Sequence, residues 1–447
     1  MSNLESLTQR LLEFAKSAGA DAADSLAVDG TSINIDVRVG KLEQAERSEG
    51  IDIGLRVLVG QRQACVSASD TRDETLRAMA ERAVVMAKEA PEDPYIGLAD
   101  PADLARDWNV DALELADPGD EPTAAFLQEQ AEQAEAAALT NTGISQVQSA
   151  SAGYGKRNIH LATSTGFSGG YSRTDHGVSC VAIAGTGTGM ERDFDSDVRI
   201  WSADLRDPAE IGKVAAERTV ARMGARKPKT GAYPVVFDER ISSSLIGHML
   251  AAVNGAAIAR GSSWLMNNLG KQILPNGMSV VEDPGRPRIA GSRPFDGEGL
   301  LATKRAIVED GVLQSWTLDL ATARKLGLNS THSASRGTSS PPSPSVGNIA
   351  LTQGTQTQAE LLKDMGRGLL VTSMIGSSIN PNTGDYSRGA SGYWVENGQI
   401  QYPINECTLA GNLNDMLLSL RAANDARLHL SRLVPSLLVE GLTLAGE

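Results

Sequence analysis

The sequence predicts an α+β protein: helix–antiparallel meander–helix units repeated in the N-terminal half, followed by a mixed α+β C-terminal domain. Three observations predict it. Helix-like segments open and close each N-terminal unit. Between them, stretches that alternate polar and apolar residues are separated by glycines, which is typical of antiparallel strands and their turns. Beyond residue 229, strand-like and helix-like patterns are mixed, which indicates a domain of the α+β type.

The first unit is predicted over residues 1–90 and begins with a helix over Leu4–Ala18, which Gly19 ends. Strands are predicted over Ser32–Val39 and Ile51–Val59, because polar and apolar residues alternate there. The apolar residues of the helix recur at helical spacing: Leu4, Leu7, Leu11 and Phe14.

A second helix over about Arg72–Glu89 completes this unit, with Asp70 as its predicted cap and Pro91 beyond its end. The next segment, residues 91–121, is acidic and rich in proline. Proline disrupts regular elements, so we expect a linker here.

The second unit, residues 122–228, is predicted to repeat the order of the first. A helix covers about Pro122–Leu139, strands run through Ile144–Trp201, and a helix covers about Pro208–Met223. The two units share no evident sequence identity, so the repeat is one of architecture.

The C-terminal domain, residues 229–447, is predicted to begin within the basic segment Arg226–Lys229. A strand over Tyr233–Phe237 leads into a buried amphipathic helix over Ser242–Arg260. The apolar run Leu369–Ile375 predicts a strand that is covered on both faces.

Two further segments of this domain have distinctive compositions. Asn397-Gly398 lies between strand-like stretches and predicts a two-residue hairpin turn. The segment Ser330–Ser345 is rich in serine and proline and has almost nothing to bury, so we expect a long mobile loop.

Composition excludes several classes of protein. The 447 residues suffice for two or three domains. The three cysteines form no CxxC motif, because they lie far apart in sequence, at Cys65, Cys180 and Cys407. This favours a reducing, cytoplasmic location. No apolar stretch has the length of a signal peptide core or a membrane span. A net charge of −14 disfavours binding to nucleic acid.

Histidine spacing gives no zinc motif, because none of the five histidines forms HxH, HxxxH or HExxH with another. His176 and Cys180 would share one face of a strand, which would allow a ligand pair or a cysteine nucleophile with its base. Two half-buried strand residues are the more ordinary interpretation. His248, on the predicted C-terminal helix, is by itself more typical of a hydrogen-bonded core histidine than of a metal ligand.

Two glycine-rich motifs have ordinary structural interpretations. Gly166–Gly170 matches GxSxG, but a nucleophile elbow needs a helix after the serine, and a strand is predicted there. Gly185–Met190 resembles a phosphate-binding loop, yet Met190 occupies the third glycine position, so we interpret it as a turn.

Two C-terminal segments carry candidate binding residues. Asp296 and Glu298 lie among glycines in PFDGEG, and Asp385 and Arg388 lie in NPNTGDYSRGASGY. Such loops can place backbone donors and a guanidinium against an extended peptide or a carboxylate. Structural turns, with Asp385 and Arg388 paired to each other or to the backbone, remain the alternative.

Several blocks together resemble the TldD/TldE family of bacterial peptidase subunits, also known by the label modulator of DNA gyrase, and specifically its TldE (PmbA) branch. The resemblance covers nearly the whole chain. Its most specific parts are GHMLAAVNGAAIARGSSWL (247–265), PFDGEG, ARKLGL (323–328), TGDYSRGASGYWVENGQIQYPINE (383–406) and LAGNLNDM (409–416).

In the TldD branch this helix carries HExxxH, and a cysteine near the C-terminus completes a zinc site. The first His of that motif falls on His248, the Glu on Met249 and the second His on Val253. Residues 422–447 contain no cysteine, and Cys407 matches another part of the pattern. Neither Met249 nor Val253 can hold zinc or accept a proton from zinc-bound water.

The resemblance therefore implies a zinc-free subunit with no catalytic residue and no cofactor of its own. A TldD-like partner would hold zinc and hydrolyse unfolded or short peptides, in the maturation of peptide antibiotics or the removal of antitoxins. We expect His248, Glu298, Asp385 and Arg388 to line the peptide path, and the isolated chain to be able to form homodimers.

Two other functions remain open on the sequence. One is a self-sufficient hydrolase with an unrecognised site, such as His176 with Cys180. The other is a homodimeric regulator that binds peptides or proteins without any link to proteolysis.

Overall fold

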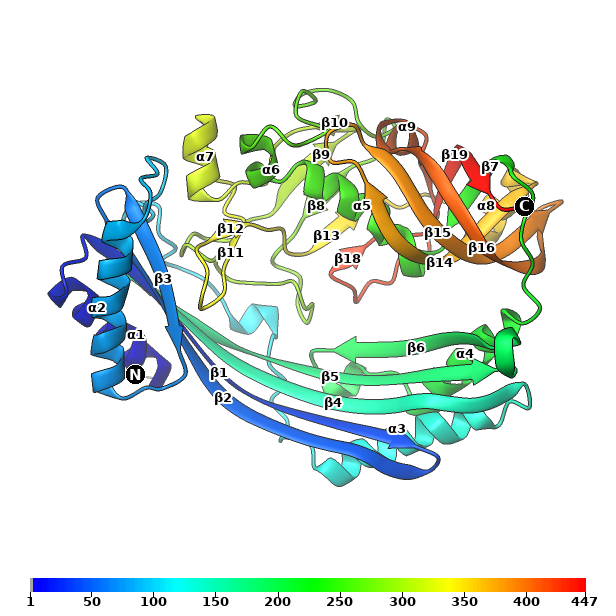
Figure 1. Cartoon of the computed structure of the whole chain (residues 1–447), viewed down its shortest axis with the longest axis horizontal. Coiled ribbons are helices and arrows are strands. Elements are labelled where there is room, and N and C mark those ends of the chain that lie inside the picture. The colour runs from blue at the N-terminus through cyan, green and yellow to red at the C-terminus, as the bar shows by residue number, and fades with distance from the viewer. Residues whose placement is uncertain (1–2) are drawn as a thin grey trace.

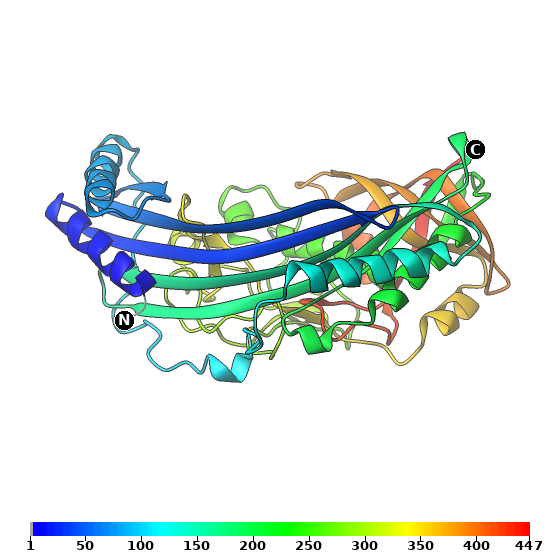
Figure 2. The same cartoon turned by 90° about the horizontal axis from the view of Figure 1, so that it is seen from below.

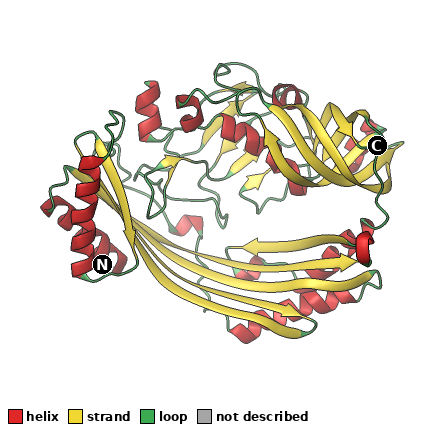
Figure 3. Cartoon of the chain, viewed as in Figure 1, coloured by secondary structure: helices red, strands yellow, loops and turns green. Residues whose placement is uncertain are grey.

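A long curved sheet and a C-terminal domain above its concave face make up the molecule (Figure 1). The computed structural model describes residues 3–447. Helices and antiparallel strands occur in both parts, which confirms the predicted α+β class (Figure 3). The N-terminal half contains α1 (Asn3–Ser17), β1 (Ala22–Arg38), β2 (Lys41–Val59), β3 (Arg62–Ala68), α2 (Asp73–Glu89), α3 (Ala124–Leu139), β4 (Ile144–Thr163), β5 (Ser168–Ala184), β6 (Glu191–Arg199) and α4 (Pro208–Ala221).

The two predicted meanders are joined edge to edge in one six-stranded antiparallel sheet. Its order is β3-β2-β1-β4-β5-β6, so β1 of the first meander pairs with β4 of the second. This pairing continues from Asp24 opposite Thr163 to Val37 opposite Ala150. The strands are much longer than predicted, since β1 has 17 residues and β2 has 19. The repeat of helix, meander and helix is confirmed.

The helices cover the convex side of the sheet at its two ends. Figure 2 shows α3 and α4 lying along the strands at one end and α1 and α2 at the other. Helices α3 and α4 approach so closely that a Cβ on Gly212 would lie only 1.9 Å from the carbonyl oxygen of Ala134. Only glycine fits at this position. Across residues 3–447, no helix is long and apolar enough to cross a membrane.

The start of α2 differs from the prediction that Asp70 caps the helix. Arg72 occupies the N-cap position and makes no side-chain cap hydrogen bond. The Asp70 carboxylate accepts hydrogen bonds from the backbone N–H of Arg72 and the hydroxyl of Thr75. Asp70 therefore stabilises the turn that leads into the helix, two residues before the cap itself.

The segment 91–121 has only one short 3₁₀ turn, Asp111–Leu113, and is otherwise irregular. It is nevertheless packed. Trp108 lies 5.4 Å from Phe167 and 5.3 Å from Phe295, measured between ring centroids, and Leu104 forms a β-bridge with Leu300. This connection thus fills space between the N-terminal sheet and the C-terminal domain.

Two sheets form the C-terminal domain, with orders β16-β15-β14-β7-β19-β17 and β10-β9-β8-β13-β18. Between these sheets and α5 lies the largest apolar core of the chain. Its elements are β7 (Gly231–Phe237), α5 (Glu239–Ala252), α6 (Gly255–Ala259), β8 (Val280–Glu282), β9 (Arg305–Glu309), β10 (Val312–Leu313), α7 (Leu320–Leu326), β11 (Ala334–Ser335), β12 (Ser343–Pro344), β13 (Ile349–Leu351), α8 (Gln358–Met365), β14 (Gly368–Ile379), β15 (Asp385–Glu396), β16 (Gln399–Asn412), α9 (Leu413–Leu418), β17 (Arg421–Ala422), β18 (Arg432–Leu433) and β19 (Leu437–Ala445).

Several predicted turns and strands of this domain are confirmed. The run Leu369–Ile375 lies within β14. Asn397 and Gly398 connect β15 to β16 with φ values of 53° and 72°, the left-handed pair that a two-residue hairpin requires. Gly187–Gly189 is a short 3₁₀ turn between β5 and β6, as expected from its interpretation as a turn.

The prediction of one continuous helix over Ser242–Arg260 is wrong. Helix α5 ends at Ala252 and α6 begins at Gly255. The break has a clear cause: the backbone N–H of Gly255 donates to the carbonyl oxygen of Thr317, and the Asn254 side chain accepts from the N–H of Ala256. Pairing with a neighbouring segment thus overrides the local helical pattern.

The expectation that Ser330–Ser345 has almost nothing to bury is also wrong. Within this segment β11 pairs with β12, and Ser333 and Ala334 are buried. The segment descends toward the N-terminal sheet (Figure 1), where Arg336 forms an ion pair with Asp24 of β1. The ion pair between Arg336 and Asp24 holds the segment in place. These residues are far apart in sequence, so the composition of the segment does not reveal their contact.

Candidate peptide-path site

His248 lies on α5 and faces β15. Its ring packs edge-on against Tyr386, with 6.0 Å between ring centroids. The Nε2 atom is buried and has no hydrogen-bond partner among residues 3–447. Burial lowers the pKa of His248, and the nearby positive charge of Arg388 lowers it further. The imidazole is therefore neutral at physiological pH, and its Nε2 atom is an enclosed polar group without a partner.

Arg388 and Tyr386 lie two residues apart on β15, so their side chains share a face of that strand. The Arg388 Nε atom donates to the carbonyl oxygen of Gly376 on β14 at 2.6 Å. The Tyr386 hydroxyl lies 3.3 Å from Met374 Sδ, and burial raises the pKa of Tyr386. Sequence reasoning missed Tyr386, although its even spacing from Arg388 on a predicted strand was a usable signal.

The other two predicted path residues lie apart from this pair. Asp385 is exposed at the start of β15, where its carboxylate accepts from Thr383 at 2.6 Å and from Asn412 at 3.1 Å. These two hydrogen bonds lower the pKa of Asp385. An odd separation along the strand places Asp385 and Arg388 on opposite faces. The two side chains therefore do not pair with each other, but Arg388 does bond to the backbone, as the other half of that alternative expected.

Glu298 is buried in a different environment, at the start of α7. Its Oε2 atom accepts a hydrogen bond from the backbone N–H of Leu320 at 2.9 Å. Burial raises the pKa of Glu298 well above its ordinary value, and the carboxyls of Asp296 and Asp319 raise it further. Glu298 thus interacts with a buried acidic group, whereas His248, Tyr386 and Arg388 form the cluster on α5 and β15.

His176 and Cys180 do share a face of β5, but four residues separate them by about 13 Å along a strand. His176 contacts Asp117, with 3.3 Å between Nε2 and Oδ2. Cys180 is fully buried in an apolar core, and burial raises its pKa to about 12. A protonated, enclosed thiol that far from the imidazole is a poor nucleophile.

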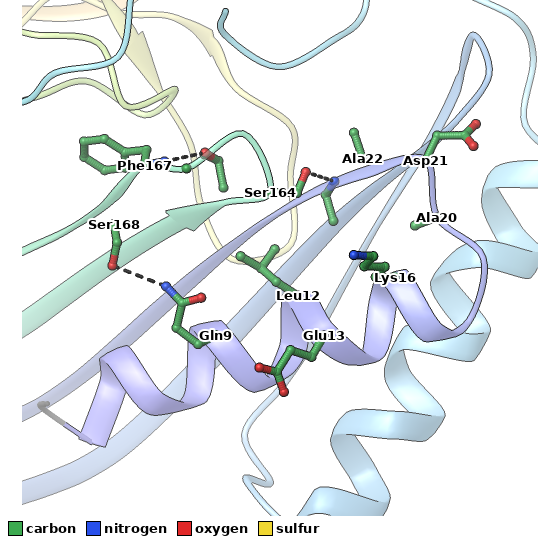
Figure 4. A pocket seen from close by; sticks show the side chains of 13 residues that line it. Gln9, Leu12, Glu13, Lys16, Ala20, Asp21, Ala22, Ser164, Phe167 and Ser168 are labelled. Atoms are coloured by element: carbon green, nitrogen blue, oxygen red, sulfur yellow. Dashed lines mark hydrogen bonds between the residues drawn. The ribbon is translucent and has the colours of Figure 1, made fainter. Parts of the chain in front are cut away.

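Ser168 of the GxSxG motif is the first residue of β5, so a strand follows the serine as predicted. The serine lines a cavity of about 550 Å³ between α1 and the turn from β4 to β5 (Figure 4). Its Oγ atom accepts from Gln9 at 3.4 Å and lies 3.5 Å from His160 Nε2. The strand–turn–helix context of a nucleophile elbow is missing.

Comparison with known proteins decides the family. The chain is 35% identical to metalloprotease PmbA of Escherichia coli O157:H7, over 99% of this chain and 96% of that protein. The chain belongs to the PmbA/TldD metallopeptidase family. Sequence profiles described as PmbA/TldA metallopeptidase domain 1, central domain and C-terminal domain match residues 23–87, 114–223 and 230–446.

Other members of the PmbA/TldD family are similar along their whole length. The PmbA homologue of Haemophilus influenzae is 35% identical, over 98% of this chain and 94% of that protein. A Bacteroides thetaiotaomicron crystal structure described as a candidate modulator of DNA gyrase is 26% identical, with a TM-score of 0.93 and full coverage of both chains. TldE from Thermococcus kodakarensis has the same fold, with a TM-score of 0.86 at 19% identity, over 98% of this chain and 99% of that one.

The family's zinc pattern can be placed on this structure. At the positions that match the Glu and second His of HExxxH, Met249 and Val253 are both 0% exposed and pack into the main C-terminal core. Across residues 3–447, no three His, Cys, Asp or Glu side chains lie together in a group that could hold a metal ion. Zinc sites in proteins use at least three such ligands, so the residues around His248 do not fit zinc.

Proposed function

We propose that this chain is the zinc-free subunit of a cytoplasmic, heteromeric metallopeptidase that cleaves unfolded or short peptides. One observation carries the proposal. Met249 and Val253 fill the apolar core at positions where the TldD pattern has a proton acceptor and a zinc ligand. An apolar side chain cannot substitute for either chemical role. Zinc and the hydrolytic step are assigned to a TldD-type partner.

The contribution of this chain would be to bind and orient the peptide. The neutral His248 ring has a buried nitrogen without a partner, which a peptide reaches only if the ring turns toward it. Arg388 has a guanidinium whose Nε–H donates to the carbonyl oxygen of Gly376, which leaves its other N–H groups for a peptide. A guanidinium donates to carboxylates and carbonyl oxygens in a fixed geometry, and an imidazole can hydrogen-bond a peptide N–H. Both groups can hold an extended peptide without taking part in bond cleavage.

The test of this function is a reconstitution. The full-length chain and a TldD-type subunit are purified separately, and hydrolysis of an unstructured peptide is measured for each alone and for the mixture. We expect no cleavage by this chain alone, and cleavage by a mixture that co-elutes in size-exclusion chromatography. If this chain does not associate with the partner, and its addition leaves cleavage unchanged, the assignment is wrong.

Within that complex, Arg388→Ala should lower peptide hydrolysis by about tenfold, as expected for loss of one charge-assisted hydrogen bond worth about 1.4 kcal/mol. The zinc content of the complex should not change. Arg421→Ala is the matched control, because Arg421 lies in the same sheet but pairs with Asp364 at the surface. Unaltered turnover in Arg388→Ala would remove this residue from the peptide path.

A further inference from the structure

A second cavity lies between the two halves of the molecule, away from His248. It has a volume of about 310 Å³ and is bordered by β1, β4 and β5 on one side. The opposite side is formed by residues 290–293, 295–297, 334–336 and 345–347. Ligand pockets of proteins begin at about 300 Å³, so the space suits a small molecule.

Three arginines from different segments line this cavity: Arg173 on β5, Arg293 before the PFDGEG motif, and Arg336 after β11. The Arg336 side chain is only 1% exposed. Among the described residues, its Nε and Nη2 atoms have no hydrogen-bond partner, and the same holds for Arg293 Nε. Buried guanidinium N–H groups without partners are costly, and they leave Arg336 and Arg293 with unsatisfied donors beside the cavity.

The carboxylates near these arginines do not balance their charge. Asp24 is shared by Arg336 and Arg56, which is also buried. Glu282 is likewise shared by Arg293, at 3.4 Å, and Arg305, at 2.9 Å. Each carboxylate therefore faces two arginines. Each set of one carboxylate and two arginines carries one excess positive charge.

Arg173 adds a further positive charge. Its guanidinium donates to the carbonyl oxygen of Ala290, a neutral acceptor. Asp296 also borders the cavity, but its oxygens accept from the backbone N–H groups of Glu298, Leu300 and Ala334. Its carboxyl also interacts electrostatically with Arg293 and so offsets part of the positive charge. Even with Asp296 ionised, five arginines face three carboxylates (Asp24, Glu282 and Asp296), so positive charge remains in excess.

The rest of the wall is apolar and aromatic. The rings of Tyr171 and Phe295 pack edge to face with 5.6 Å between centroids. Aliphatic side chains complete this wall: Leu26, Val28, Ile159 and Leu161. The cavity thus combines an oxyanion-binding side with a surface that favours an apolar group.

We propose that this cavity binds a small organic oxyanion that carries an apolar or aromatic group. Guanidinium pairs bind carboxylate and phosphate in the same bidentate manner, so either oxyanion satisfies the chemistry. The ligand's charged end would accept hydrogen bonds from Arg336, Arg293 and Arg173, while its apolar end contacts Phe295 and the aliphatic wall. This site is separate from the peptide path, and the proposal does not depend on the peptidase assignment.

Calorimetric titration of the full-length chain tests the proposal at constant ionic strength in sodium chloride. The probes are N-acetylphenylalanine, phenyl phosphate, inorganic phosphate and the neutral N-acetylphenylalaninamide. At least one of the two aromatic oxyanions should bind with 1:1 stoichiometry, and at least tenfold more tightly than the amide. The better of the two identifies the ligand as a carboxylate or a phosphate.

Variants locate the binding. Arg173→Gln should weaken binding about tenfold, because it removes a partly exposed guanidinium that no carboxylate holds. Arg157→Gln is the matched control, since Arg157 lies directly opposite Arg173 in the β4–β5 pairing but does not line the cavity. Circular dichroism verifies that both variants fold.

The proposal is overturned if neither aromatic oxyanion binds at millimolar concentration, or if the amide binds equally well. Binding of inorganic phosphate alone would also overturn it, because the apolar wall would then have no role. Equal weakening by Arg157→Gln and Arg173→Gln would place the ligand elsewhere and reject the site.

Discussion

Asp24→Asn should lower the free energy of unfolding by about 3–5 kcal/mol, the usual cost of removing one partner from a buried ion pair. Asp24 on β1 holds Arg56 of β2 at 2.8 Å and also pairs with Arg336 of the C-terminal domain. The side chains of all three residues are at most 5% exposed. An asparagine leaves both guanidinium groups without a counter-charge inside the protein, which is why the expected loss is large.

The stabilisation by Asp24 depends on pH, because only the ionised carboxylate pairs with the two arginines. Burial, the largest influence, raises the pKa of Asp24, but Arg56 and Arg336 outweigh it and hold this pKa below its ordinary value. The stabilisation is therefore fully present above the unfolded-state pKa of about 3.9 and is lost as the pH falls through the folded-state value.

Urea unfolding followed by tryptophan fluorescence measures the effect at pH 7 and at lower pH. Asp36→Asn is the matched control, because Asp36 lies on the same strand and is only partly buried. Asp36→Asn should change the free energy of unfolding by no more than about 0.5 kcal/mol. Equal stability of Asp24→Asn and the wild type at pH 7 would show that this ion-pair group does not connect the two halves.

Glu298→Gln should raise the free energy of unfolding at neutral pH. The expected gain is about 1.4 kcal/mol for each unit by which folding raises the pKa of Glu298. Burial, with the added effect of Asp296 and Asp319, raises the pKa of Glu298. The folded state therefore binds a proton that the unfolded state releases above pH of about 4.3. Stability is greatest below that pH and falls as the pH rises toward the folded-state pKa.

Glutamine retains an oxygen for the N–H of Leu320 and cannot ionise. The difference in unfolding free energy between the variant and the wild type should be small at pH 4 and should grow up to pH 7. Glu309→Gln, at the exposed end of β9, should show no such trend. Parallel pH profiles for the wild type and Glu298→Gln would contradict a raised pKa at this position.

Local signals predicted the elements whose residues determine their own conformation. The Asn397-Gly398 turn requires left-handed backbone that these two residues adopt readily, and its hairpin forms as predicted. The amphipathic spacing of α1 and the proline beyond α2 likewise place these helices within one or two residues. Such features depend on neighbours in sequence, so the sequence alone reveals them.

Features that depend on distant partners were not predictable. The break between α5 and α6 is determined by pairing of Gly255 with Thr317, and the position of the Ser330–Ser345 segment by Arg336 and Asp24. The strands also extend well beyond their predicted bounds, because β1 is covered by partners on both edges. A single sequence carries no signal for these contacts.

The structure brings together only two of the four residues that we expected to line the peptide path. His248 was selected because the first His of the family pattern falls on it, and Arg388 by residue type. The structure places both beside Tyr386, on α5 and β15. Glu298 and Asp385 were also selected by residue type, yet their neighbours are an acidic group and a turn. Residue type indicates what a side chain can do, but only the fold decides which side chains meet.

The metal content of the isolated full-length chain tests the central claim most directly. The chain is equilibrated with zinc, separated from free metal by gel filtration, and analysed by inductively coupled plasma mass spectrometry. We expect far less than one zinc ion per chain, with no loss of fold on treatment with a chelator. One tightly held zinc ion per chain that is lost on His248→Ala, together with peptide cleavage by the isolated chain, would contradict a zinc-free subunit.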